Sequence, residues 1–474
     1  MIKKYRKKCM QNYDIVVIGG GPGGYKCAIR SAQLGLKVAC VDKNEILGGT
    51  CLRVGCIPSK ALLHFSHEYY HIKNHLDEVG ITCNSLSFNL DKIMSFKNKN
   101  ITELSNGINY LFASNKIDRL CGVGKIRSIN SNNFDITVTG SNGEQKITAK
   151  YVVIATGSEV ASFPGIEIDE KNVVSSTAAL SFKEVPKKLV VVGAGAIGLE
   201  MSSVWSRFGS EVTVVEFLDK IAPSMDGDIS KALLASLKKQ GINFKLSTKV
   251  TSINKSSDNL TIHLGSVKDG KSEIIEAEKV LISIGRIPYT DGLIDPNCIE
   301  CDSRGFIKVN NKYETNIPGI FAIGDVIGGA MLAHKAEEEG IAVAELIAGN
   351  IPHVDYDIIP SVIYTHPAVA SIGKTEESLK NINYAYSVGK SNFSANSRSK
   401  ITNNGEGFVK VLTSKENNAI LGVHIIGAYA DTIINEAAIA MAYRASSEDV
   451  FRISHSHPDV NEAFKDACEA AYLK

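Results

Sequence analysis

Short apolar runs alternate with longer amphipathic stretches in two separate parts of the chain. The first part has apolar runs at 14–18 and 36–41, and the second has them at 189–192 and 211–215. Short apolar runs bounded by turn residues predict buried strands. Strands that alternate with helices predict a parallel sheet with both faces covered. We therefore expect an α/β fold in which one supersecondary unit occurs twice.

The remaining pattern predicts helices in the middle of the chain and another class of domain at its end. Helices are expected at 60–75, 90–114 and 334–348. From residue 356 onward strands are followed by helices, which is typical of an antiparallel α+β domain. The predicted domains are 10–157 completed by 286–352, then 158–285, and finally 353–474.

Two G-x-G-x-x-G turns each stand between a predicted strand and a predicted helix. A single turn of this kind is weak evidence, but each copy is followed 18 residues later by a carboxylate, Asp42 or Glu216. Such glycines let the backbone approach a pyrophosphate at a helix N-terminus, and the carboxylate accepts hydrogen bonds from a ribose. The sequence therefore predicts two Rossmann-like dinucleotide-binding domains. Their glycines are Gly19, Gly21 and Gly24 in the first copy and Gly193, Gly195 and Gly198 in the second.

Composition excludes several classes of function. Lys and Arg total 52 against 51 Asp and Glu, so no net field attracts nucleic acid or an anionic membrane. No apolar run reaches the roughly 18 residues that span a bilayer, and ten cysteines are too sparse for a secreted disulfide scaffold. We expect a soluble protein of the cytoplasm, with the mitochondrial matrix as the alternative. The basic stretch 1–9 is interpreted as a tail or an upstream start, and a targeting role stays open.

The segment 48–60 contains a Cys-x4-Cys pair, Cys51 and Cys56. Such a pair could be half of a zinc site, but no further thiolate or imidazole recurs at a suitable spacing nearby. If the two cysteines lie at the start of a helix, a disulfide can join them with some distortion. A strained bridge is more easily reduced, and a helix N-terminus lowers the pKa of a thiol. The spacing favours exchange chemistry over metal binding.

This cysteine segment closely resembles the active-site signature of the pyridine nucleotide-disulfide oxidoreductases. The segments 331–340, 364–367 and 455–462 match the family in the same order, so the resemblance covers essentially the whole chain. It is strongest to the branch that oxidises dihydrolipoyl groups. It implies FAD and NAD as cofactors and a C-terminal domain that forms a homodimer.

The resemblance also implies catalytic roles. Cys51 would face the dithiol substrate and Cys56 would lie beside the flavin. Lys60 would sit near the flavin and pair with Glu200.

At the C-terminus, His457 and Glu462 match the family's base and the carboxylate that orients it. A neutral imidazole can take a proton from the dithiol, and the carboxylate stabilises the resulting imidazolium. In relatives this histidine comes from the other subunit.

Further positions match residues that contact the two cofactors in the family. For FAD these are Asp42, Lys43, Gly49, Thr50, Lys60, Gly124, Thr156, Gly157, Asp325, Met331, Leu332, Ala333 and His334. For NAD these are Ala196, Ile197, Glu216, Val250, Gly285 and Arg286.

Charge near the second turn favours NAD over NADP, because Glu216 and Asp219 would repel a 2′-phosphate. The expected activity is oxidation of dihydrolipoyl groups of 2-oxo acid dehydrogenase or glycine-cleavage complexes, with lipoyl-lysine on an acyltransferase or carrier protein as the partner. The alternatives are an NAD(P)H-dependent disulfide reductase of the glutathione or mercuric reductase type and an inactive flavoprotein scaffold. We expect no metal, nucleic acid or membrane as a partner.

Two features depart from this picture. Arg53 stands where many relatives carry asparagine. Its charge between the two thiols could lower the pKa of a thiol or contact the substrate, and we expect it to leave the reaction itself unchanged. His64, His67, His71 and His75 recur at helical spacing. A partly buried or interface helix is favoured over a metal site, because no carboxylate or thiolate completes a ligand set.

Overall fold

The computed structural model describes residues 11–129, 133–141, 143–256, 259–293 and 298–474. The basic stretch 1–9 lies outside the described residues. The chain divides into two compact units, and the three-domain division stays a prediction. Unit 1 comprises Met1–Pro58, Ser95–Ala161 and Arg286–Val354, and unit 2 comprises Ser59–Met94, Ser162–Gly285 and Asp355–Lys474.

Unit 1 is built on a seven-stranded sheet in the order β3-β2-β1-β6-β5-β4, with β17 paired to β6. Strands β1, β2, β3, β6 and β17 run parallel, whereas β4, β5 and β6 form an antiparallel meander. The strands expected at 14–18 and 36–41 are confirmed as β1 and β2. The bounds are β1 (Gln11–Ile18), β2 (Val38–Asp42), β3 (Asp118–Cys121), β4 (Val123–Ile129), β5 (Phe134–Gly140), β6 (Gly143–Ile154) and β17 (Ile320–Ala322), and β7 (Ser158–Val160) pairs with β16 (Arg286–Pro288) in a separate ribbon.

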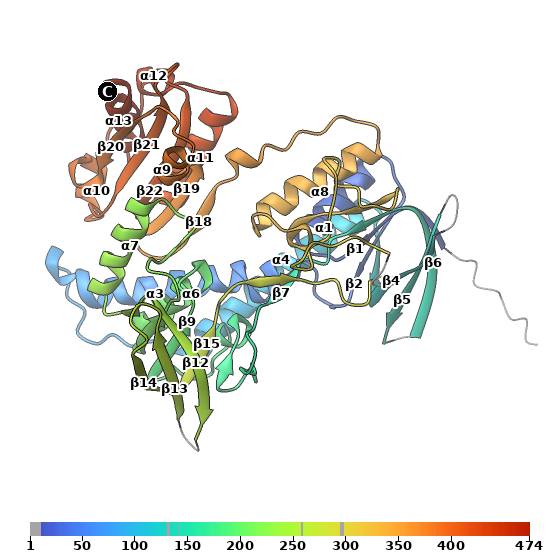
Figure 1. Cartoon of the computed structure of the whole chain (residues 1–474), viewed down its shortest axis with the longest axis horizontal. Helices are drawn as coiled ribbons and strands as arrows, with labels where there is room; N and C mark the ends of the chain where they lie inside the picture. The colour runs from blue at the N-terminus through green and yellow to red at the C-terminus, as the bar shows by residue number, and fades with distance from the viewer. Residues whose placement is uncertain (1–10, 130–132, 142, 257–258, 294–297) are drawn as a thin grey trace, which may run out of the picture. The chain divides into compact units, whose positions relative to one another are not determined.

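Successive residues of β1 pack on opposite faces of this sheet, as the two-residue period of a strand requires. Ile15 and Val17 join a core with α1 (Pro22–Gln33) and α8 (Ala333–Ile347), whereas Val16 and Ile18 join the core on the other face. Helices α1 and α8 lie side by side (Figure 1). A Cβ at Gly340 of α8 would come within 2.3 Å of the Gly23 carbonyl oxygen, so glycine is what lets the two helices approach so closely.

Unit 2 contains a second parallel sheet in the order β11-β10-β9-β15-β8. Its strands at 189–192 and 211–215 are confirmed as β9 and β10, and α6 follows β9 directly. Between β11 and β15, the chain forms a separate antiparallel sheet, β12-β13-β14. The bounds are β8 (Val173–Val174), α5 (Ser176–Ala179), β9 (Lys188–Val192), α6 (Ala196–Phe208), β10 (Glu211–Val215), α7 (Gly227–Lys239), β11 (Asn243–Lys245), β12 (Thr248–Lys255), β13 (Leu260–Ser266), β14 (Ser272–Ala277) and β15 (Lys279–Ile282).

The C-terminal part of unit 2 is an antiparallel sheet in the order β18-β19-β22-β21-β20, followed by helices. The expected α+β class is confirmed. The bounds are β18 (Ser361–Ile363), β19 (Ala368–Gly373), α9 (Glu376–Asn381), β20 (Tyr386–Asn392), α10 (Ser397–Ile401), β21 (Phe408–Ser414), β22 (Ile420–Gly427), α11 (Ala430–Ala442), α12 (Ser447–Arg452) and α13 (Glu462–Tyr472).

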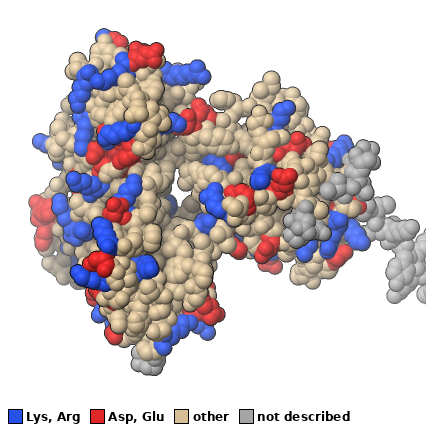
Figure 2. Space-filling view, in the orientation of Figure 1, with Lys and Arg blue, Asp and Glu red and all other residues tan. Residues whose placement is uncertain are grey.

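The predicted middle helices are present as α3 (Cys56–His75), α4 (Leu90–Ser114) and α8. Among the described residues, no helix is both long enough and apolar enough to cross a membrane. Basic and acidic side chains are mixed over the face drawn in Figure 2, in line with their nearly equal numbers.

Candidate active site

The first glycine turn joins β1 to α1 in unit 1. A Cβ at Gly24 would lie 1.8 Å from the Gly19 carbonyl oxygen, so close packing of the turn requires this glycine. A Cβ at Gly21 would meet nothing nearer than the Gly49 Cα at 3.7 Å. Gly21 is therefore not required by contacts with the protein alone. It is the N-cap of α1 and supplies no side-chain cap, so the N–H groups of the first helical turn face no capping side chain.

The second glycine turn, between β9 and α6 in unit 2, repeats this construction. A Cβ at Gly198 would lie 2.0 Å from the Gly193 carbonyl oxygen, whereas a Cβ at Gly195 would meet no atom within 4 Å. Gly195 is the N-cap of α6 and also supplies no side-chain cap. Ala196 and Ile197 form the start of α6.

A carboxylate closes each turn from the end of the next strand. Asp42 at the end of β2 accepts a hydrogen bond from the Gly20 N–H at 2.7 Å, and Glu216 after β10 accepts one from the Ala194 N–H at 2.6 Å. Both side chains are largely buried. Together with an open glycine and an uncapped helix start, each carboxylate forms a donor and acceptor set that fits a dinucleotide.

The cysteine segment rests against the first glycine turn. The Gly48 N–H donates to the Gly20 carbonyl oxygen at 2.8 Å, and a Cβ at Gly49 would lie 2.6 Å from the Gly21 Cα. Cys51 lies in α2 (Gly49–Val54), next to Thr50, and Cys56 is the first residue of α3. The segment is therefore held at the position where the first dinucleotide would bind.

The two cysteines do not share one continuous helix, which corrects the expectation of a single helix start. Gly55 ends α2 with φ −138° and ψ −116°, and α3 begins at the next residue. A Cβ at Gly55 would lie 2.8 Å from the Thr50 carbonyl oxygen. Cys51 is half-buried and Cys56 is exposed.

The expected ion pair between Lys60 and Glu200 is present within unit 2. The Lys60 Nζ lies 2.8 and 3.0 Å from the two carboxylate oxygens of Glu200, which is 5% exposed. Ser59 donates its hydroxyl to the same carboxylate at 2.8 Å, and the Tyr364 N–H donates at 3.0 Å. The Lys60 ammonium also lies 4.5 Å from the centre of the Tyr364 ring. These contacts together fix one lysine and one carboxylate.

A second polar cluster in unit 1 contains Arg286 and Asp325. The Ser158 hydroxyl donates to Asp325 at 2.5 Å, and Arg286 donates to the Ser158 hydroxyl and carbonyl oxygens, both at 2.6 Å. Burial lowers the pKa of the Arg286 guanidinium, while Asp325 acts in the opposite direction. Sequence reasoning did not identify Ser158, because nothing in its local pattern marks it.

Near this cluster, the loop after β6 contains Thr156 and Gly157. The Thr156 hydroxyl donates to the Tyr289 carbonyl oxygen at 2.6 Å, and the Lys43 ammonium lies 3.8 Å from the Tyr289 ring centre. Tyr289 is a further residue that the motifs did not reveal.

The other expected cofactor positions belong to several elements. Met331 and Leu332 precede α8, and Ala333 and His334 begin it. Gly124 lies in β4 beside β2 in unit 1, whereas Val250 lies in β12 and Gly285 directly precedes β16. Their contact with a cofactor stays a prediction.

His457 and Glu462 form a hydrogen-bonded pair in unit 2. The imidazole Nδ1 lies 3.0 Å from one Glu462 carboxylate oxygen and 3.2 Å from the other. The Asp459 N–H and the His457 ring both hydrogen-bond to Glu462 and lower its pKa. Because Nδ1 is engaged by the carboxylate, Nε2 is the nitrogen available to a substrate proton.

The histidines of α3 are arranged as a ladder of rings. His67 and His71 have centroids 6.1 Å apart, and His71 and His75 have centroids 5.8 Å apart. His366 lies over His67 with centroids 3.9 Å apart. Among the described residues, no group of three or more His, Cys, Asp or Glu side chains is placed to hold a metal ion.

Comparisons with known proteins identify relatives over nearly the whole chain. A family model described as pyridine nucleotide-disulphide oxidoreductase matches residues 13–340, and the dimerisation domain of the same class matches residues 359–468. Mitochondrial dihydrolipoyl dehydrogenase 1 of Arabidopsis thaliana is 52% identical over 462 residues, covering 97% of this chain and 90% of that protein. Mitochondrial dihydrolipoyl dehydrogenase of Caenorhabditis elegans is 52% identical over 466 residues, covering 98% and 93%.

A solved structure with the same architecture comes from Escherichia coli. It is a Cu(II) complex of an HOCl-induced flavoprotein disulfide reductase, 25% identical to this chain. The TM-score is 0.85, and the match covers 97% of this chain and 99% of that one.

Proposed function

Since this chain belongs to the pyridine nucleotide-disulphide oxidoreductases, we propose that it oxidises dihydrolipoyl groups with NAD through FAD and the Cys51–Cys56 pair. The observation that carries the proposal is the cysteine segment packed on the first dinucleotide turn, where Gly48 donates to Gly20. That contact joins a thiol pair to a cofactor site. Relatives that are dihydrolipoyl dehydrogenases, 52% identical over nearly the whole chain, support the same activity.

The expected enzyme class, the α/β fold and the use of FAD and NAD are confirmed by the family match and by these relatives. Each of the two glycine turns provides a site for one of the dinucleotides. FAD held by the first glycine turn and Asp42 would supply the two-electron chemistry that connects a thiol pair with NAD.

The cysteines perform the exchange with the substrate. One thiolate of the dihydrolipoyl group attacks the Cys51 sulfur of the Cys51–Cys56 disulfide, and Cys56 leaves as a thiolate. The second substrate thiolate then attacks the sulfur joined to Cys51, which releases the cyclic lipoyl disulfide and leaves both cysteines reduced. His457 accepts a substrate proton at Nε2 while Glu462 holds Nδ1. Overall, dihydrolipoyl and NAD⁺ give lipoyl, NADH and H⁺.

The second turn favours NAD over NADP. Glu216 is fixed by the N–H groups of Ala194 and Leu218, at 2.6 and 2.8 Å, with its carboxylate at the end of β10. A ribose diol can donate to this carboxylate, whereas a 2′-phosphate would be repelled by it.

The dimerisation domain over residues 359–468 supports a homodimer, in which His457 of one copy serves the thiols of the other. Lipoyl-lysine on an acyltransferase or carrier protein is the expected partner. Several relatives are named as mitochondrial proteins, which favours the matrix alternative over the cytoplasmic expectation.

The test is steady-state formation of NADH from dihydrolipoamide by the purified holoenzyme. We expect rapid reduction of NAD and at least tenfold lower kcat/KM with NADP. Preference for NADPH with glutathione disulfide or Hg²⁺ as the acceptor would instead support the reductase alternative. Absence of turnover with all of these substrates would support the inactive scaffold.

A further inference from the structure

Arg53 lies in the last turn of α2, between the two cysteines in sequence. Its Nη1 donates a hydrogen bond to the Asn44 side-chain oxygen at 2.9 Å. The guanidinium is therefore engaged by the loop that follows β2.

Asn44 in turn binds the carboxylate of Asp42. The Asn44 backbone N–H and side-chain Nδ2 both donate to Asp42 Oδ1, at 2.8 and 2.9 Å. The amide can have only one orientation here, because the carboxylate requires the NH₂ group and the guanidinium requires the oxygen. The other carboxylate oxygen, Oδ2, accepts the Gly20 N–H at 2.7 Å.

These contacts form one continuous chain of hydrogen bonds, which connects Arg53 through Asn44 and Asp42 to Gly20. It runs from the cysteine helix to the carboxylate that we assign to the FAD ribose. All four residues belong to unit 1. The backbone contacts of Gly48 and Gly49 with the glycine turn are a separate connection, and Arg53 adds the side-chain one.

The Nε–H group of the Arg53 guanidinium is a further potential hydrogen-bond donor. Its Nε is buried, and no acceptor for it is found in the part of the chain that the structure describes. A buried N–H without an acceptor costs free energy, so this atom favours an arrangement in which a bound group supplies one.

We propose that Arg53 is a positioning residue that couples retention of FAD to the placement of the Cys51 helix. This inference rests on the proposed function, since it takes Asp42 as an FAD ligand. Binding of the ribose to Asp42 orders Asn44, and Asn44 holds α2 through Arg53. Because such coupling is reciprocal, loosening α2 weakens FAD binding to the same extent.

The experiment follows FAD release from the holoenzyme by the rise in flavin fluorescence on dilution. Arg53→Asn is expected to release FAD about tenfold faster than wild type, as for loss of a charge-assisted hydrogen bond of about 1.4 kcal/mol. Arg53→Lys retains a cation and is expected to rescue part of the loss. Arg127→Asn, which removes an exposed arginine of the same unit, is the matched control and is expected to release FAD at the wild-type rate.

A double-mutant cycle separates positioning from a general loss of stability. Asn44→Ala and Arg53→Asn are each expected to accelerate release, and the double variant is expected to be no faster than Asn44→Ala alone. The KM for NAD should be unchanged in Arg53→Asn, while iodoacetamide should alkylate Cys51 of the NADH-reduced enzyme at a rate different from wild type.

Wild-type release rates in Arg53→Asn, or additive effects in the cycle, would overturn the proposal for Arg53. Purified wild-type protein that cannot bind FAD would instead overturn the proposed function.

Discussion

At the scale of single residues, the proposed site contains two carboxylates in different surroundings. Glu200 is buried and binds the Lys60 ammonium, whereas Glu462 binds an exposed imidazole. Hydrogen bonds from the Asp459 N–H and from His457 lower the pKa of Glu462, so it stays ionised at pH values where an ordinary glutamate begins to protonate. An ionised Glu462 keeps His457 in the tautomer with its proton on Nδ1 and Nε2 free.

Replacement of His457 by glutamine is expected to lower kcat for dihydrolipoamide oxidation by about 10² to 10⁴, the usual worth of a positioned general base. Glu462→Gln should cost less, because the imidazole is retained and only its orientation and charge partner are lost. Steady-state kinetics at pH 8 measure both. Equal kcat for His457→Gln and wild type would exclude this histidine as the base.

Residues inside a recognisable motif could be predicted from the sequence, and residues that act through tertiary contacts could not. The pairing of Lys60 with Glu200 followed from resemblance, although 140 positions separate them. Ser158 bridges Arg286 and Asp325, but a single serine after a strand has many structural uses. The Arg53 contact with Asn44 depends on the conformation of the loop after β2, which has no periodic signal.

At the scale of elements, the glycines of each turn differ in what they do: the third is needed for packing, and the second is expected to serve ligand binding. The third glycine of each turn is required by the protein, because a Cβ at Gly24 or Gly198 would collide with a carbonyl oxygen. The second glycine of each turn has room for a Cβ. We therefore expect any requirement for glycine there to come from the bound dinucleotide.

Gly195→Ala is therefore expected to fold with a thermal midpoint within about 2 °C of wild type and to raise the KM for NAD at least tenfold. Its N-cap position has φ −78°, which alanine tolerates. Gly198→Ala should instead lose stability, because its Cβ would lie 2.0 Å from the Gly193 carbonyl oxygen. Calorimetry and NAD kinetics on both variants measure this contrast. A large stability loss in Gly195→Ala would contradict the assignment.

Two partly buried histidines, His67 in α3 and His366 after β18, make unit 2 sensitive to acid. Burial lowers the pKa of His67 to about 4 and that of His366 to about 3, and the neighbouring Arg207 acts in the same direction. Both rings are neutral in the folded protein, but ordinary histidines in the unfolded chain gain protons below about pH 6.5. The unfolded state thus binds more protons, and stability falls as the pH is lowered from about 6.5 to about 4.

His67→Gln is expected to reduce the pH dependence of the free energy of unfolding, by an amount equivalent to the uptake of up to one proton. The single tryptophan, Trp205, is fully buried in the core of unit 2 and reports its unfolding by urea. Unfolding at pH 7 and pH 5 gives the slope. His64→Gln, an exposed position on the same helix, should change the slope less, because His64 is only a minor cause of the lowered His67 pKa. Identical slopes for His67→Gln and wild type would contradict this account.

Periodic elements were predicted well, and interruptions were not. Helices α3 and α4 follow from long amphipathic stretches, since their pattern repeats over many turns. The break at Gly55 was missed because a glycine between two cysteines is equally compatible with one helix. The β12-β13-β14 sheet was also missed, since its pairing depends on contacts between strands.

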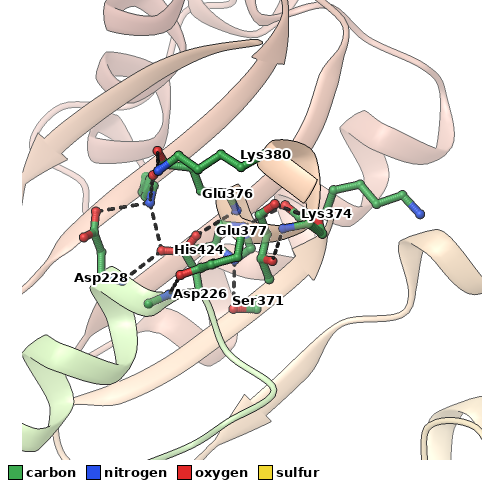
Figure 3. A network of polar contacts seen from close by, with 12 residues as sticks. Asp226, Asp228, Ser371, Lys374, Glu376, Glu377, Lys380 and His424 are labelled. Atoms are coloured by element: carbon green, nitrogen blue, oxygen red, sulfur yellow. Dashed lines mark hydrogen bonds and ion pairs between the residues drawn. The ribbon is translucent and has the colours of Figure 1, made fainter. Parts of the chain in front are cut away.

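At the scale of the whole molecule, a buried ionic network joins two parts of unit 2 (Figure 3). Lys410 of β21 is 2% exposed and binds Asp226, Asp228 and Glu376 at 2.8, 3.1 and 2.6 Å. Asp226 and Asp228 lie at the start of α7, and Glu376 begins α9. Burial would raise the pKa of Glu376, but hydrogen bonds from Lys380, Lys410 and Tyr386 lower it to about 2. The network therefore holds the second nucleotide-binding part against the C-terminal sheet.

Lys410→Met is expected to destabilise unit 2 by about 3–5 kcal/mol at pH 7, because it leaves the fully buried Asp226 without its cation. Lys380→Met is the matched control. Lys380 binds the same Glu376 from a largely exposed position, so its loss should change stability far less than the loss of Lys410. Urea unfolding followed by Trp205 fluorescence measures both changes. Comparable losses in the two variants would show that burial of the network is not the source of its stability.

The order of sheets along the chain was predictable, because the duplicated glycine turns and the change to an antiparallel pattern can each be recognised in a short stretch of sequence. The network around Lys410 was not, since it joins residues up to 184 positions apart and a buried lysine resembles any other in sequence.

The most direct test of the proposed mechanism is NADH formation from dihydrolipoamide by Cys51→Ser holoenzyme beside wild type. The variant is expected still to bind FAD but to lose at least 10³-fold of the dithiol-dependent rate, because Cys56 alone cannot form the disulfide that the substrate attacks. Wild-type turnover in the variant would contradict it.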